Sequence, residues 1–127
     1  MFAFSDEHKM VRQMVRKWVN EKLVPVNEAL DQNQMLPYDL MRDFARTFGL
    51  PDLARAAFER NVNRDKPKRE DGEANVGGDP AMQAILAVEM SRINPGFFMA
   101  FGAWVGLAGG AIMAKGTPAQ RRRWALP

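Results

Sequence analysis

The uncharged stretch from Ile93 to Ala114 constrains the fold more than any other feature of the chain. Glycines recur in it at every fourth position, Gly102, Gly106 and Gly110, so a helix here would carry one face of nearly bare backbone. Each glycine costs a helix roughly 1 kcal/mol relative to alanine. Three at one spacing therefore indicate a reason in packing or in binding. Either a second helix approaches closely, or a groove stays open for a slim apolar ligand such as an alkyl chain.

This stretch is close to the length that crosses a bilayer. In a membrane the glycine face would be a tandem GxxxG association surface, followed on one side by Lys115 and the arginines at 121–123. The glycines lower its hydropathy, however, and the amphipathic segments before it need something to pack on. A helix that is apolar all round can equally be the central helix of a soluble bundle. Both interpretations stay open at this point.

Helical periodicity dominates the rest of the chain, and no strand-like alternation occurs. Ser5 and Asp79 are predicted N-caps, Pro37, Pro80 and Pro118 suit first turns, and Gly49 and Gly116 suit helix ends. We predict helices over 6–23, 37–48, 53–62, 80–93, 96–114 and 118–127. Pro25 either interrupts the first of these or starts a short helix that fades through 31–34. Their predicted inward-facing residues are Met10, Val11, Met14, Val15, Trp18, Val19, Leu40, Met41, Phe44, Ala45, Phe48, Met82, Ile85, Leu86, Glu89, Met90 and Ile93.

These patterns predict one all-α domain over residues 1–127, an orthogonal or up-down bundle of about five or six helices. A chain of this length buries enough surface to fold without disulfides or a structural metal. The segment 61–78 mixes both charges with proline and glycine and shows no apolar period, so we expect a flexible, exposed loop there.

Composition excludes several kinds of chemistry. The chain has no cysteine and a single histidine, His8, so disulfides, thiolate sites and multi-histidine metal sites are excluded, and we expect no metal site. We interpret His8 as exposed and structural. The net charge of +3 is concentrated near the end of the chain rather than along a broad surface, which argues against nucleic-acid binding. The first ten residues lack the pattern of a secretory signal.

Four segments, in this order, resemble the N-terminal helical domain of acyl-CoA dehydrogenases. They are the opening FSDEHKMVRQMVRKWVNEKLVP, then LPYDLMRDFARTFGL, then the glycine-rich AILAVEMSRINPGFFMAFGAWVGLAGGAIMAK, and the ending GTPAQRRRWALP. The resemblance covers nearly all of the chain except about 51–76. It favours the soluble interpretation, without membrane or nucleic-acid partners.

The resemblance implies a parent oxidoreductase of fatty acid metabolism in the cytoplasm. That parent would be a flavoprotein that uses FAD for the α,β-dehydrogenation of an acyl-CoA thioester, and a homo-oligomer, dimer or tetramer. In the family, a β-sheet domain and a C-terminal helical domain follow and hold the flavin. We therefore expect no catalytic and no cofactor-binding residue in this chain, and no activity of the chain alone.

The family's N-terminal domain lines the acyl-chain pocket with its glycine-rich helix. Carried over by position, the lining candidates here are Phe98, Met99, Ala100, Ala103 and Leu107. Ordinary core packing would give the same pattern. Two other functions stay open: a free-standing helical interaction module, and a single-span membrane protein that associates through Gly102, Gly106 and Gly110.

Overall fold

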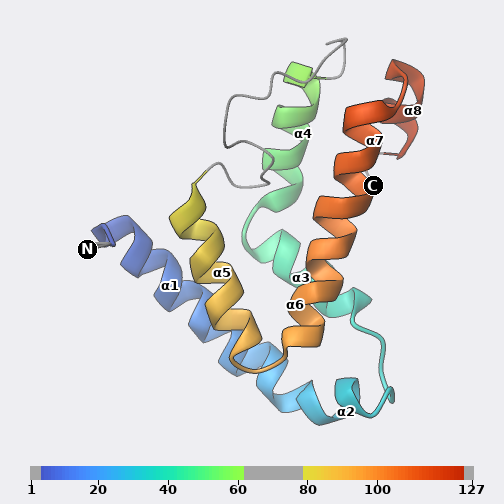
Figure 1. Cartoon of the computed structure of the whole chain (residues 1–127). Helices are drawn as coiled ribbons and strands as arrows, with labels where there is room; N and C mark the ends of the chain where they lie inside the picture. The colour runs from blue at the N-terminus through green and yellow to red at the C-terminus, as the bar shows by residue number, and fades with distance from the viewer. Residues whose placement is uncertain (1–3, 62–78, 125–127) are drawn as a thin grey trace.

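The computed structural model describes residues 4–61 and 79–124, and within these ranges all regular structure is helical, as predicted (Figure 1). The predicted loop at 61–78 lies outside the described residues, except for Asn61, which ends a helix. In order, the elements are α1 (Asp6–Trp18), the π-helical η1 (Val19–Leu23), the 3₁₀ turn η2 (Val24–Val26), α2 (Asn27–Asp31), α3 (Tyr38–Thr47), α4 (Leu50–Asn61), α5 (Pro80–Ser91), α6 (Pro95–Gly102), the π-helical η3 (Ala103–Ala108), α7 (Gly109–Lys115) and α8 (Pro118–Trp124).

Most predicted helix ends are confirmed. Asp79 caps α5 through its bond from the Ala81 N–H, and Gly49 follows α3 with a φ of 65°, the left-handed conformation that glycine tolerates best. The helix predicted over 53–62 instead begins at Leu50, directly after that glycine. Its second residue is a proline, which the first turn of a helix accepts because the N–H has no partner there.

A single histidine joins the starts of α1 and α5. The Ser5 hydroxyl accepts the His8 N–H at 3.2 Å, and the Ser5 N–H donates to His8 Nδ1 at 3.1 Å, which completes a capping box. On its other side, His8 Nε2 lies 2.7 Å from Asp79 Oδ2. That hydrogen bond is the main reason why the pKa of Asp79 lies below its ordinary value. The expectation that His8 is exposed was wrong, because its side chain is only 17% exposed.

The core forms around Trp18 at the end of α1. Its ring meets Phe44 of α3 edge-on at 4.9 Å between centroids and stacks on Phe97 of α6 at 6.2 Å. Its indole N–H donates to Asp43 Oδ2 at 2.8 Å, so the one polar atom of this buried ring is satisfied. The rest of this cluster consists of Val15, Val19, Leu23, Met41, Phe44, Met90, Phe97 and Phe101.

A buried carboxylate fixes how α1 packs against α5. Glu89 of α5 is fully buried and accepts bonds from Arg12 Nε at 2.8 Å and from Arg16 Nε and Nη2 at 2.9 and 2.8 Å. Because α1 turns these two arginines toward α5, its opposite edge faces solvent. The prediction that Met10 and Met14 face the core was therefore wrong, since both are about half exposed.

The segment from Pro95 to Lys115 is one long helix made of α6, η3 and α7. It starts at Asn94, whose Oδ1 accepts the Phe97 N–H at 2.7 Å. The Asn94 Nδ2 donates to Asn27 and Asp31, the first and last residues of α2, at 2.8 and 3.0 Å. Figure 1 shows this helix rising away from the α1–α5 pair, with α8 folded back at its far end. It is long and apolar enough to cross a membrane, yet only 11% of its most apolar window is buried. It is therefore not a central helix within the described chain.

Replacing Glu89 with glutamine should lower the free energy of unfolding by about 2 kcal/mol at pH 7, because hydrogen bonds to a charged group are lost. The pKa of Glu89 is lowered, mainly by its bond from Arg16. The ionised Glu89 therefore contributes its full share of the free energy of unfolding above the ordinary glutamate pKa of about 4.3. This contribution is lost as the pH falls through the lowered pKa that Glu89 has in the folded chain. Urea unfolding of the wild type and of Glu89→Gln at pH 7 and pH 3 measures the free energy of unfolding of each.

The difference in free energy of unfolding between the wild type and Glu89→Gln should be smaller at pH 3 than at pH 7. As a control, the exposed Glu21→Gln should change stability by less than about 0.5 kcal/mol at either pH. A difference that stays constant between the two pH values would show that the charge of Glu89 is not what stabilises the contact between α1 and α5.

Candidate functional site

The five candidate lining residues lie on α6 and η3, at the base of the long helix. Met99 and Leu107 are 69% and 75% exposed, and Ala103 is exposed as well. Phe98 and Ala100 are half-buried and pack against the edge of the core. The structure thus places Met99, Ala103 and Leu107 on the uncovered side of the helix and the other two at its margin.

Two phenylalanines hold this helix to the core from the other side. Phe97 and Phe101 are buried, and the Phe101 ring meets Phe44 edge-on at 5.3 Å between centroids. Since residues four apart share a helix face, this pair anchors the base of the helix and orients the opposite face outward. Trp104 packs edge-on against Phe101 at 6.1 Å and is itself partly exposed.

The glycine face is open. A Cβ atom built at Gly102, Gly106 or Gly110 meets nothing within 4 Å. Of the two explanations that the sequence left for these glycines, close packing by a neighbouring helix is therefore wrong for Gly106 within the described chain. The glycines leave space that no described residue fills.

A π-helical turn lies in the middle of this helix, over Ala103–Ala108. Met99, Ala103 and Leu107 are spaced four residues apart across the start of this turn, and all three are exposed. The sequence analysis missed this turn.

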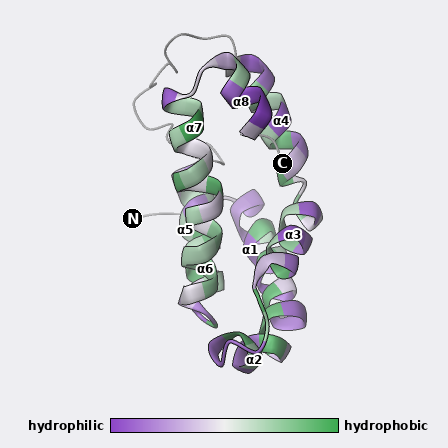
Figure 2. Ribbon diagram, turned by 90° about the vertical axis from the view of Figure 1, so that its right-hand side faces the viewer, coloured by the Kyte–Doolittle hydropathy of each residue, from purple (hydrophilic) through white to green (hydrophobic). Residues whose placement is uncertain are grey.

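The uncovered face is chemically uniform. Residues 96–114 carry no charge, and their only polar side-chain group is the indole N–H of Trp104. Figure 2 shows the contrast with the hydrophilic α8 that follows. Among the described residues, no group of acidic or histidine side chains could hold a metal ion. What this face can do is exclude water from an apolar partner.

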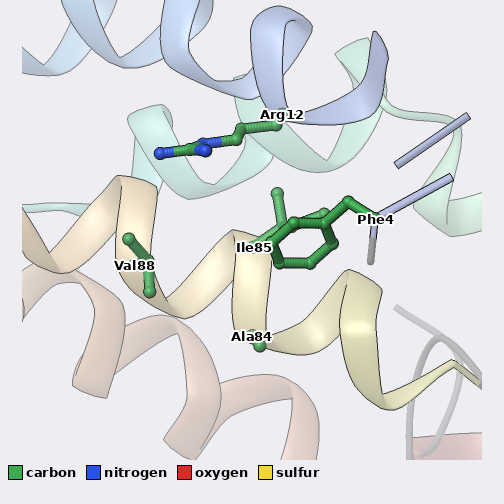
Figure 3. Close-up of a pocket in the computed structure, with 5 residues that line it drawn as sticks. All are labelled: Phe4, Arg12, Ala84, Ile85 and Val88. Atoms are coloured by element: carbon green, nitrogen blue, oxygen red, sulfur yellow. The ribbon is translucent and has the colours of Figure 1, made fainter. Parts of the chain in front are cut away.

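Sequence reasoning also missed two cavities along α1 and α5. One, of about 230 Å³, is lined by Lys9, Arg12, Gln13 and Arg16. The other, of about 120 Å³, is lined by Phe4, Arg12, Ala84, Ile85 and Val88 (Figure 3). All four residues of the first cavity lie on α1, so their helical spacing could have revealed it. The second cavity could not be found from the sequence, because it forms only where α5 packs against α1.

Comparison with known proteins gives one match. A family model described as "Acyl-CoA dehydrogenase, N-terminal domain" matches residues 5–56 and 66–127. No curated protein and no solved structure matches the chain.

Replacing Gly106 with leucine should leave the chain as stable as before or stabilise it by up to about 1 kcal/mol, since leucine is the better helix former and the space is open. Replacing Gly116 with alanine is the contrasting variant. A Cβ there would lie 2.5 Å from the carbonyl oxygen of Ile112, so the backbone must shift, and we expect a loss of about 1–3 kcal/mol. Thermal unfolding measures both. Destabilisation by Gly106→Leu as large as that by Gly116→Ala would mean that the glycine face is covered.

Proposed function

The chain belongs to the acyl-CoA dehydrogenase family as its N-terminal domain, and on this premise we propose that its uncovered helix forms one wall of the pocket for the acyl chain of an acyl-CoA thioester. The observation that carries the proposal is the exposed apolar line of Met99, Ala103 and Leu107 beside the open glycine face. A saturated chain makes no hydrogen bonds, so a straight, uncharged wall is the surface that binds it best.

The glycines define how such a wall discriminates between ligands. Gly102 and Gly110 are eight residues apart, which is about 12 Å along a helix. With no side chains along that length, an extended alkyl chain can lie close to the helix backbone. Burial of each methylene contributes about 0.8 kcal/mol, so longer chains gain more from this face than short ones.

In the proposed parent, the reaction is an α,β-dehydrogenation, and FAD would supply the electron acceptor. The described residues of this chain do not fit a flavin by themselves. The candidate wall offers a single hydrogen-bond donor, on Trp104, and the cavities along α1 and α5 are smaller than the roughly 300 Å³ at which ligand pockets begin. Proton removal and flavin binding belong, in this proposal, to the parent's β-sheet and C-terminal helical domains.

Other exposed apolar residues fit contacts with those domains and between subunits of a homo-oligomer. Leu36, Leu53 and Trp124 are each more than half exposed and lie outside α6 and η3. Large side chains of this kind on one small domain are typical of surfaces that another domain or subunit covers. We propose the cytoplasm as the location of the parent.

The membrane-spanning alternative rests on the same uncovered helix. It predicts that the chain needs detergent to stay dispersed, because the helix would otherwise expose its apolar face to water. Membership of the acyl-CoA dehydrogenase family favours the pocket wall instead. Detergent-free solubility with a helical circular dichroism spectrum would eliminate the spanning form.

The proposed wall can be tested in a chimera in which this chain replaces the N-terminal domain of an active family member. Gly106→Leu would fill the groove and should lower kcat/KM at least ten-fold more for a long-chain acyl-CoA than for a short-chain one. Steady-state kinetics with both substrates measure the ratio. As a matched control, Ala54→Leu adds the same kind of side chain to the exposed surface of α4 and should leave the ratio unchanged. An equal loss for both chain lengths would contradict the proposal.

A further inference from the structure

A second apolar space lies where the start of the chain and α1 meet α5. Figure 3 shows the ring of Phe4 and the side chain of Arg12 on either side of a space above α5. The floor of this space is Ile85, with Ala84 and Val88 at its sides. Its volume is about 120 Å³, it is open to solvent, and its lining is almost entirely apolar. It suits a short aliphatic segment better than water.

A cationic groove adjoins this space and shares Arg12 with it. The groove, of about 230 Å³, is lined by Lys9, Arg12, Gln13 and Arg16, so it presents two guanidinium groups and an ammonium group. No acidic side chain lines it among the described residues. The two cavities share Arg12, so the apolar lining of one adjoins the cationic lining of the other at this residue. The Lys9 ammonium group is paired with the exposed Asp6 at 2.9 Å.

The arginines retain hydrogen-bonding capacity toward this groove. Glu89 takes the Nε of Arg12 and the Nε and Nη2 of Arg16. Within the described chain, both terminal nitrogens of Arg12 and one of Arg16 thus have no protein acceptor. The single charge of Glu89 is shared among Arg12, Arg16 and, at 3.7 Å, Arg92, so the cluster keeps a net positive charge. Glu89 also holds the two α1 guanidinium groups in fixed positions, which lowers the entropic cost of binding an anion.

We propose that these two cavities form one binding site for a small amphipathic anion, an aliphatic chain that ends in a carboxylate. The carboxylate binds the terminal nitrogens of Arg12, near Lys9 and Arg16, and the aliphatic chain lies over Ile85 beside Phe4. This site shares no residue with the proposed acyl-chain wall on α6 and η3 and does not depend on it.

Octanoate is a suitable probe, since it combines a carboxylate with a short unbranched chain. Titration into the 127-residue chain, followed by calorimetry and by amide shifts in NMR, should show saturable binding at one site. The shifts should concentrate at the start of α1 and along α5. Acetate, which lacks the chain, and octanol, which lacks the charge, should each bind at least ten-fold more weakly.

Two variants separate the contributions of the two cavities. Ala84→Leu fills the apolar space, and Gln13→Glu places a negative charge in the groove while Arg12, Arg16 and Glu89 themselves stay unchanged, so each should weaken octanoate binding at least ten-fold. The matched controls are Ala54→Leu on exposed α4 and Gln34→Glu in the exposed turn after α2, which should bind octanoate like the wild type.

Three outcomes would overturn the proposal. One is octanol binding as tightly as octanoate, which would show that charge plays no part. Another is amide shifts confined to residues 95–110, which would place the ligand on the proposed wall instead. The third is unchanged affinity in both Ala84→Leu and Gln13→Glu, with circular dichroism showing that both variants are folded.

Discussion

The buried carboxylate of Glu89 is the contact on which the arrangement of the other helices depends. A carboxylate with no access to water is stable only with its charge compensated, and both of its oxygens here bind guanidinium groups from α1. This requirement fixes the rotation of α1 against α5. The rotation in turn directs Val15 and Trp18 into the core and leaves Met10 and Met14 in water.

The direction of the long helix relative to α1 and α5 is set at a single point, the connection between α5 and α6. Asn94 follows α5, caps α6 and binds two polar side chains of α2, so three elements meet at one buried amide. Phe97 and Phe101 then fasten the base of the long helix to Trp18 and Phe44. Beyond Phe101, no residue of this helix is fully buried in the described chain, which leaves its apolar surface for another partner.

The uncovered helix and the family membership support each other. In an isolated globular domain, an exposed helix without charged residues would be a liability for aggregation, since apolar patches of that extent are rarely left open on a monomer. The acyl chain that we propose for this helix, in the family whose N-terminal domain the chain matches, would supply such a cover. The exposed residues Met99, Ala103 and Leu107 lie on this uncovered part of the helix.

The sequence by itself determined the helices and their ends. Capping residues, prolines and glycines act within a few residues of the chain, so Ser5, Asp79, Pro80 and Gly49 could be assigned from the sequence pattern. The family was also readable, because four local segments in the right order carried it. Tertiary structure alone decided which face of each helix is covered. Met10 and Met14 have the spacing of core residues, and His8 has the position of an exposed one, yet a distant glutamate and a distant aspartate reversed both assignments. The open space beside Gly106 likewise depends on where no other helix lies, which no local pattern records.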